Sequence, residues 1–291
     1  MAEIVVASGK GGVGKSTLSS SLSLMFKDHG VGIVDADAEA PNLHLLLDVK
    51  WKEEREFKSK SVAVIDYSKC TGCMLCKNVC TYEAIEGTTT PIIKEYICEG
   101  CNACGVVCPV GAIKISQNNL SGWIRIGETE FSPFVMGEMD VGQANSGKLV
   151  TEVKNIARSW VKDGKIRNLI VDSAAGIGCQ VIASLSGANY AILVVEPTDS
   201  SLSDLKRVYY LAQHFRVKSF IVINKYDINP GFSKIEDFAR EENLEIIGKI
   251  PYDKNIPKSM AMRKTIIEYD KNSPASLEIF NIAQKIENIL E

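Results

Sequence analysis

A run of nine residues near the start of the sequence has the composition of a phosphate-binding loop. Residues 9–17 read Gly-Lys-Gly-Gly-Val-Gly-Lys-Ser-Thr, after an apolar segment, Ile4–Ala7, that predicts a buried strand. Glycines let consecutive backbone N–H groups converge on phosphate oxygens, and a following helix adds the positive end of its dipole. Lys15 is expected to reach the β- and γ-phosphates, and the Ser16 hydroxyl to coordinate Mg²⁺. The residues expected to contact nucleotide here are Gly11, Gly12, Val13, Gly14, Lys15, Ser16 and Thr17.

Cysteines form the second group of residues suited to chemistry. Eight of the nine fall between Cys70 and Cys108, in two runs of the form Cys-x₂-Cys-x₂-Cys-x₃-Cys that are offset by 28 residues. In a reducing compartment, clustered thiols indicate metal ligation before disulfides. Zinc needs only two cysteines from each run, which leaves the third and fourth unexplained. Iron–sulfur clusters use all four, and the spacing favours them.

The two runs resemble those of bacterial two-cluster ferredoxins, in which the fourth cysteine of each run ligates the other cluster. The resemblance implies two [4Fe–4S] clusters. One set of ligands is Cys70, Cys73, Cys76 and Cys108, and the other is Cys80, Cys98, Cys101 and Cys104. Gly72 and Gly100 are expected to let the backbone approach the sulfides, and Thr81 replaces the usual proline. Because the segment has little apolar core, we expect the clusters to hold it folded.

The rest of the sequence alternates apolar β-rich runs with helical patterns, as in a parallel sheet covered by helices. Further strands are predicted at 32–35, 169–172, 191–195, 220–224 and 245–248, and helices at 16–27, 150–161, 202–214, 235–242 and 275–290. We predict an α/β fold, a mostly parallel P-loop NTPase sheet with helices on both faces, interrupted by a small α+β domain. The ATPase domain would cover 1–59 and 117–291, and the ferredoxin-like insert 60–116. Residues 50–60 and 117–122 are interpreted as solvated linkers.

Lys10 makes the phosphate loop more specific. The loop resembles the deviant Walker A motif of the MinD/ParA-like ATPases, a family that includes the iron–sulfur cluster carrier ATPases and the nitrogenase iron protein. In that family the early lysine reaches the nucleotide of the partner subunit. The resemblance therefore implies an ATP-dependent homodimer in which Lys10 acts across the interface.

Acidic residues at the ends of two predicted strands also match the family. Asp35 would lie near Mg²⁺, and Asp37 would orient or deprotonate the attacking water, unless it only caps a turn. Asp172 follows a buried strand and fits a Walker B aspartate that holds Mg²⁺ through water. Residues 172–176 resemble the second switch of the cluster carriers, with two alanines in place of prolines and with Gly176 as the γ-phosphate sensor.

Later positions of the sequence match less specific features of the family. Asn224 would bind adenine through its amide and the chain at Pro251 through its backbone, whereas Tyr252 is equally compatible with packing. Cys179 lies seven residues after Asp172, at about the distance of a cluster ligand in the nitrogenase iron protein. Cys179 is compatible with two roles, a ligand of a third cluster between two subunits or a thiol of the switch segment with no metal.

Composition limits the partners. The net charge of −3 argues against a general polyanion binder. No apolar run reaches the roughly 18 residues of a membrane helix, and no secretory signal is present, so we expect a cytoplasmic protein that binds neither membrane nor nucleic acid.

The predicted function is a Mg²⁺-dependent ATPase, slow without its partner. Its ATP-dependent dimerisation would be coupled to ferredoxin-domain chemistry with a redox or metallocofactor-assembly partner protein. Electron transfer and cofactor assembly are both open. The alternative is an ATP-timed positioning or partition switch, with clusters that are structural or redox-sensing.

Overall fold

The computed structural model describes residues 2–143 and 145–290. Its largest sheet has nine strands in the order β11-β10-β9-β1-β8-β2-β7-β6-β3. Their bounds are β1 Glu3–Ser8, β2 Val31–Ala36, β3 Lys50–Ile65, β6 Ile113–Glu128, β7 Pro133–Met139, β8 Asn168–Ala175, β9 Tyr190–Val195, β10 Lys218–Asn224 and β11 Glu245–Ile250. The seven strands from β11 to β7 pair in parallel, which confirms the predicted α/β fold.

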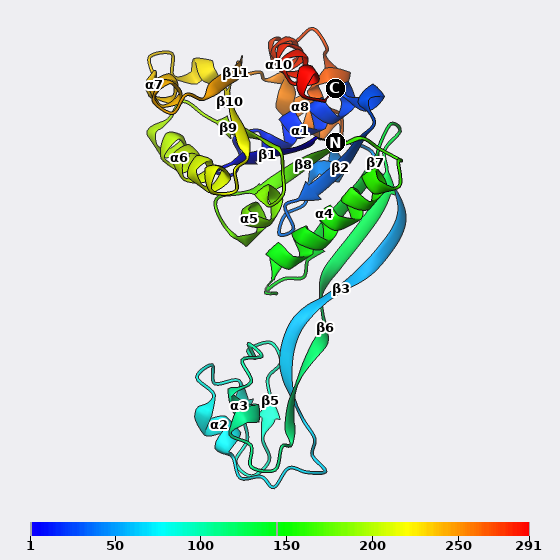
Figure 1. The fold of residues 1–291 in the computed structure, drawn as a ribbon, viewed down its shortest axis with the longest axis vertical. Helices are drawn as coiled ribbons and strands as arrows, with labels where there is room; N and C mark the ends of the chain where they lie inside the picture. The colour runs from blue at the N-terminus through cyan, green and yellow to red at the C-terminus, as the bar shows by residue number, and fades with distance from the viewer. Residues whose placement is uncertain (1, 144, 291) are drawn as a thin grey trace. The chain divides into compact units, whose positions relative to one another are not determined.

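Helices cover both faces of this sheet (Figure 1). They are α1 Lys15–Met25, α4 Ser146–Lys162, α5 Cys179–Leu185, α6 Asp199–His214, α7 Lys234–Glu241, α8 Asn255–Ala261, α9 Ile266–Tyr269 and α10 Pro274–Leu290, with 3₁₀ turns at Lys27–His29, Leu43–Leu45 and Tyr226–Ile228. On one face, Leu22 of α1 and Ile282 of α10 share an apolar core with Ile192 of β9. The C-terminal helix thus packs on the sheet, as predicted. Among the described helices, none has the length and apolar composition needed to cross a bilayer.

The contacts divide the chain into two compact units. The larger unit contains Met1–Arg55, Trp123–Asp140 and Ser146–Glu291, and the cysteine unit contains Glu56–Gly122 and Val141–Asn145. The cysteine unit includes all eight clustered cysteines, together with α2 Leu75–Val79, α3 Ala103–Val106 and the antiparallel pair β4 Ile85–Glu86 and β5 Ile92–Ile93.

The interpretation of residues 50–60 and 117–122 as linkers is wrong. They belong to β3 and β6, two neighbouring strands of the large sheet. The two strands are antiparallel, because the partner's residue number falls on β6 as the number rises on β3. The pairs are Lys52 with Glu128, Glu54 with the Arg125 guanidinium at 2.6 Å, and the Ser59 N–H with the Ser121 hydroxyl at 3.2 Å. The charged side chains that suggested a solvated loop instead form ion pairs across an antiparallel ribbon.

Candidate functional site

The glycine-lysine loop connects β1 to α1, where the sequence predicted it. Gly12 has φ = 78° and Gly14 has φ = 100°, a left-handed region that side chains rarely adopt. A Cβ atom on Gly14 would lie 2.3 Å from the Asn224 amide nitrogen, so only glycine fits there. That nitrogen donates to the Val13 carbonyl at 2.7 Å. The turn of the loop and the end of β10 therefore hold each other in place.

A cavity of about 360 Å³ opens on this loop. It is lined by Gly11, Gly12, Gly14, Lys15, Ser16, Thr17, Asp37, Asn42, Ala175, Asn224, Lys225, Tyr252, Asp253, Ile256, Pro257 and Met260. Eight of these residues were predicted as site residues, and they come from the carboxyl ends of three different strands. The structure does not place Lys10, Val13, Asp35, Asp172, Gly176 or Pro251 in the lining. The Val13 side chain is buried in the core, whereas Lys10 is exposed.

Asp172 lies directly behind the loop, within β8. It is 1% exposed, and its two carboxylate oxygens accept hydrogen bonds from the Ser16 hydroxyl at 2.7 Å and the Ser19 hydroxyl at 2.8 Å. Burial raises its pKa, while the Ser16 hydrogen bond opposes that shift. Hard oxygen donors of this kind suit Mg²⁺. The pair of Ser16 and Asp172 therefore fits a site for that ion at the inner end of the cavity.

Asp35 on β2 is paired with Asp172 in the sheet and contacts the loop that follows β2. Its oxygens accept the backbone N–H groups of Asp37 at 3.1 Å, Asn42 at 3.1 Å and Leu43 at 2.9 Å. Burial and the nearby Asp172 carboxylate raise its pKa well above the usual value. In the structure Asp35 thus holds the loop that carries Asp37, and its expected place near Mg²⁺ stays a prediction.

Asp37 projects from that loop into the cavity and is half-buried. Burial raises its pKa, and the Lys15 ammonium partly counteracts the shift. Its carboxylate also accepts the Ala40 N–H at 3.3 Å, so the turn-capping alternative is present as well. The arrangement leaves a carboxylate in the same cavity as the phosphate-loop lysine, where a proton acceptor for a bound water would be needed.

The second switch segment ends β8 and leads into α5. The strand continues through Ala174 and Ala175, whose N–H groups remain available for pairing where prolines would have none. Gly176 has φ = 92°, and its N–H donates to the Ser8 carbonyl at 2.9 Å. Ala175, rather than Gly176, contacts the cavity. Cys179 is the first residue of α5, and its thiol sulfur lies 3.2 Å from the Ser146 hydroxyl oxygen in the larger unit.

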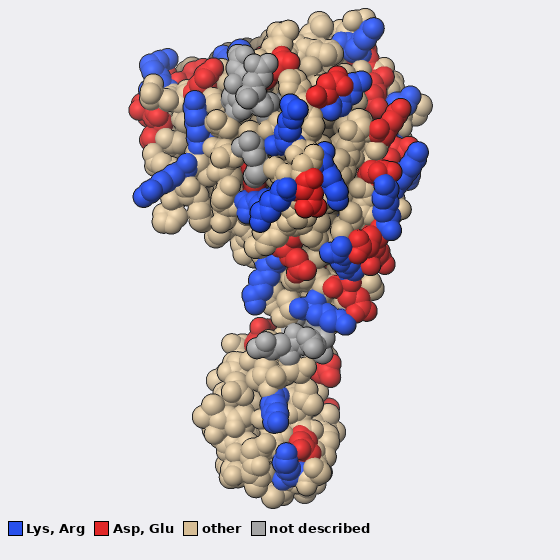
Figure 2. Space-filling model, turned by 45° about the vertical axis from the view of Figure 1, so that its right-hand side comes forward, with Lys and Arg blue, Asp and Glu red and all other residues tan. Residues whose placement is uncertain are grey.

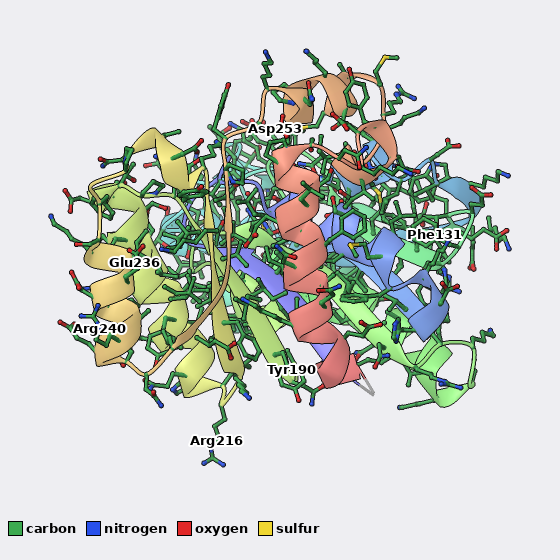
Figure 3. All side chains as sticks on the ribbon, turned by 90° about the horizontal axis from the view of Figure 1, so that it is seen from above. Phe131, Tyr190, Arg216, Glu236, Arg240 and Asp253 are labelled. Carbon is green, nitrogen blue, oxygen red and sulfur yellow. The ribbon has the colours of Figure 1, made fainter. Side chains whose placement is uncertain are left out.

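The outer wall of the cavity consists of residues 252–260, most of which the sequence did not reveal. Tyr252 is exposed and lines the cavity, and its N–H donates to Asp227 at 2.7 Å. Asp253 lies beside the first turn of α10 (Figure 3) and accepts the Asn255 N–H at 2.8 Å. The only sequence signal for this wall was its position, because the segment follows the carboxyl end of the strand β11. Ligands of open α/β sheets bind at that edge.

In the cysteine unit, each expected set of four cysteines lines one cavity. Cys70, Cys73, Cys76 and Cys108 line one, and Cys80, Cys98, Cys101 and Cys104 line the other. The described residues contain no group of three or more His, Cys, Asp or Glu arranged to hold a single metal ion. A cubane cluster takes one thiolate at each of four corners, so its ligands surround a cavity. The two sets fit that requirement.

A two-fold relation between the repeats places the fourth cysteine of each repeat in the cavity lined by the first three cysteines of the other. The Asp66 N–H donates to the Ala112 carbonyl at 2.7 Å, and the Lys94 N–H, 28 residues later, donates to the Ala84 carbonyl at 2.8 Å. Each repeat thus begins against the end of the other. The end of each repeat carries its fourth cysteine, which this pairing brings to the other repeat's first three.

Backbone N–H groups point at several of these sulfurs. Ala63 N–H donates to Cys98 at 3.4 Å, Ala84 N–H to Cys80 at 3.4 Å and Ala112 N–H to Cys108 at 3.3 Å. Such hydrogen bonds stabilise thiolates and tune cluster potentials.

Gly72 and Gly100 lie where neighbouring backbone comes close, and their expected approach to the cluster sulfides stays a prediction. Their missing Cβ atoms would lie 2.2 Å from the Thr89 carbonyl oxygen and 2.4 Å from that of Ser61. These glycines therefore make room for neighbouring backbone.

Comparisons with known proteins agree with the larger unit's geometry. The sequence matches the CobQ/CobB/MinD/ParA nucleotide binding domain family over residues 4–266. An uncharacterized protein of Methanocaldococcus jannaschii is 35% identical over 292 residues, which cover 99% of this chain and 97% of the relative. An iron–sulfur cluster carrier protein of Pyrococcus horikoshii is 25% identical over 99% of this chain and 86% of its own length. The structure of the septum site-determining protein MinD of P. horikoshii with Mg-ADP has a TM-score of 0.63 at 18% identity, covering 99% and 96% of the two chains.

Proposed function

The chain belongs to the CobQ/CobB/MinD/ParA nucleotide binding domain family, and from this premise we propose that it binds ATP with Mg²⁺ and hydrolyses it to ADP and phosphate. The observation that carries the proposal is the cavity in which Lys15, Asp37 and Asn224 meet, although 209 residues separate the first from the last in the sequence. The phosphate loop and the Lys15 ammonium bind the β- and γ-phosphates. Asn224 and the chain after Pro251 are the candidates for the adenine end.

Hydrolysis in this cavity needs a positioned water and a place for its proton. Asp37 orients the water toward the γ-phosphorus and accepts the proton as the bond to the bridging oxygen of ADP breaks. Ser16, with Asp172 behind it, would hold Mg²⁺, and the bound ion would supply charge neutralisation on the phosphate oxygens. Lys15 stabilises the charge that develops in the transition state.

Lys10 supports a dimeric form of this mechanism. It is exposed at the start of the loop, and the Ser8 hydroxyl donates to its carbonyl at 2.7 Å. This contact holds its backbone while the side chain is available to a second subunit. We assign it the contact with the partner's nucleotide, which makes ATP the link between two copies of the chain.

The cysteine unit would hold two [4Fe–4S] clusters, one in each cavity. What supports this assignment is the division of eight cysteines into two sets of four, with N–H donors directed at the sulfurs. Bound clusters would supply one-electron redox chemistry. ATP-dependent dimerisation then controls electron transfer to, or metallocofactor assembly on, a partner protein. The 25% identical cluster carrier of P. horikoshii supports the assembly variant.

The decisive experiment compares anaerobically reconstituted wild-type protein with Lys15→Ala and Lys10→Ala, and with Lys27→Ala as a control on the exposed turn after α1. Nucleotide binding is followed by calorimetry, phosphate release by a colorimetric assay, and dimerisation by light scattering. Lys15→Ala should abolish ATP binding, whereas Lys10→Ala should bind ATP but not dimerise with it. ATP binding by Lys15→Ala at wild-type affinity, or a wild-type protein that releases no phosphate, would refute the proposal.

A further inference from the structure

A buried amide on α5 contacts the loop that carries Asp37. Gln180 is 6% exposed, and its side-chain carbonyl accepts the Ala38 N–H at 2.8 Å. Its side-chain NH₂ donates to a Glu39 carboxylate oxygen at 2.7 Å. A primary amide both donates and accepts, so Gln180 satisfies the two residues that directly follow Asp37.

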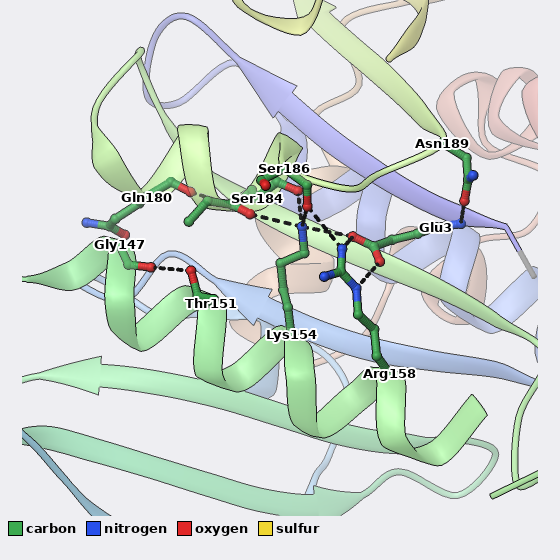
Figure 4. A network of polar contacts seen from close by, with 10 residues as sticks. Glu3, Gly147, Thr151, Lys154, Arg158, Gln180, Ser184, Ser186 and Asn189 are labelled. Atoms are coloured by element: carbon green, nitrogen blue, oxygen red, sulfur yellow. Dashed lines mark hydrogen bonds and ion pairs between the residues drawn. The ribbon is translucent and has the colours of Figure 1, made fainter. Parts of the chain in front are cut away.

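The helix that bears Gln180 is itself firmly held (Figure 4). The buried Lys154 ammonium of α4 donates to the carbonyls of Ala183 at 2.9 Å, Ser184, and Ser186 at 3.0 Å, at the carboxyl end of α5. It also pairs with Glu3 of β1 at 2.8 Å. A cation at this end of a helix is favourable for the helix dipole. Because α5 is fixed to β1 and α4, Gln180 is a fixed point for the Asp37 loop.

The other end of α5 leads back to the phosphate site. Six residues lie between Asp172 and Cys179, and the N–H of one of them, Gly176, donates to the Ser8 carbonyl below the phosphate loop. Asp172 itself binds the Ser16 hydroxyl. The segment from Asp172 to Gln180 is therefore short, and hydrogen bonds hold it at both ends: Asp172 binds Ser16, and Gln180 binds the loop after Asp37.

We propose that Gln180 is a positioning residue for ATP hydrolysis, whose amide holds residues 38 and 39 so that Asp37 faces the bound γ-phosphate. The inference deepens the proposed function and rests on ATP hydrolysis in the same cavity. Gln180 does not line the cavity, so its loss should leave ATP binding intact and slow the chemical step.

The test exchanges donor and acceptor. In Gln180→Glu a carboxylate faces the Glu39 carboxylate, and we expect kcat to fall roughly tenfold while KM for ATP changes by less than about twofold. In the exchange variant Gln180→Glu/Glu39→Gln, the new amide donates to the new carboxylate, which still accepts the Ala38 N–H. We expect kcat to recover to within about threefold of wild type. Glu39→Gln alone supplies the reference, and Gln284→Glu, an exposed glutamine of α10, controls for the added charge.

The outcomes separate this inference from the proposed function. Wild-type kcat in Gln180→Glu, or an exchange variant no faster than Gln180→Glu, overturns the positioning role. A wild-type protein without ATP hydrolysis overturns the function itself. Thermal unfolding and ATP titration of each variant establish that it is folded. If Gln180→Glu fails there, Gln180→Met, which removes both hydrogen bonds at similar length, takes its place with the same expected loss of kcat and unchanged KM.

Discussion

The two compact units of this chain are ordered by different means. Among the described residues of the larger unit, one apolar cluster on one face of the sheet contains twenty buried side chains from β1, α1 and elements up to α10. The cluster in the described part of the cysteine unit contains six buried side chains, two of which are Cys76 and Cys104, and four more cysteines pack against it. Burial raises the pKa of both buried thiols. The larger unit can fold on apolar burial, whereas the core of the smaller unit contains the cysteines that we propose as cluster ligands.

The surfaces differ in the same sense. In the view of Figure 2, basic and acidic side chains alternate over the larger unit, and the visible face of the cysteine unit shows few of either. Tyr96 and Val106 of the cysteine unit are 76% and 80% exposed. On the face seen in this view, charged side chains are therefore sparser on the cysteine unit than on the larger unit.

Removal of the clusters should give the largest contrast between the units. Chelation of iron under oxidising conditions should lower amide exchange protection in residues 61–116 by roughly a hundredfold or more, because the ligands form the core there. Protection in β1, β8 and β9 should not change. Hydrogen exchange with mass spectrometry measures both in one sample. Equal protection of residues 61–116 with and without iron would contradict the contrast.

A single cysteine change should affect half of the smaller unit's metal. Cys101→Ser removes one ligand of the second set, and we expect iron to fall from about eight to about four atoms per chain. Far-ultraviolet circular dichroism should remain close to wild type because the larger unit dominates it. Cys179→Ser is the matched control outside the repeats. Iron loss in the control, or none in Cys101→Ser, would be evidence for different ligands.

In the larger unit, the single substitution expected to lower stability most removes a buried ion pair, that of Lys154 with Glu3. Lys154→Met leaves Glu3, which is fully buried, with Arg158 alone at 2.7 Å, and we expect a loss of roughly 3 kcal/mol in the free energy of unfolding. Lys148→Met, an exposed lysine on the same helix, should cost less than about 0.5 kcal/mol. Urea unfolding measures both. Cluster absorbance should be the same in both variants, and its loss in Lys154→Met would mean that the units are not ordered independently.

Lys154 should also make the free energy of unfolding depend on pH, with a smaller effect than its substitution. Burial lowers the pKa of Lys154 to about 8, below its usual value near 10.5. Between these values the unfolded chain keeps the proton that the folded protein has lost. The contribution of this group to stability therefore rises with pH, by on the order of 2–3 kcal/mol in total. Urea unfolding at pH 7.5 and 9.5 should show a more positive slope in wild type than in Lys154→Met, and identical slopes would contradict the shift.

The parts that could be predicted from sequence are those where burial leaves a regular pattern. Strands β1, β8, β9 and β10 are buried on both faces, so their apolar runs stand out, and they were found to within a few residues. Strands β3 and β6 were missed because their exposed faces carry charges that pair across strands, such as Arg125 with Glu54. A paired charge and a solvated charge look the same in a sequence.

The candidate site divides in the same way. Lys15, Ser16 and the cysteine runs are close in sequence, and their spacing alone indicates their chemistry. Asp37 and Asn224 needed the resemblance to a family, because only the sheet brings them to the loop. The cavity wall at 252–260 depends on tertiary packing, and so do the two contacts of Gln180, which join residues 141 and 142 positions apart; neither has a local signal.

The antiparallel pairing of β3 with β6 has an engineering consequence. The chain leaves the larger unit on one strand and returns on the strand beside it, with Ser59 and Ser121 in hydrogen-bond contact. A short reverse turn spliced between these two positions would close an ordinary hairpin. The cysteine segment can therefore be deleted from the gene, or replaced by another segment, between these two positions. The product of the deletion would be the nucleotide-binding domain alone.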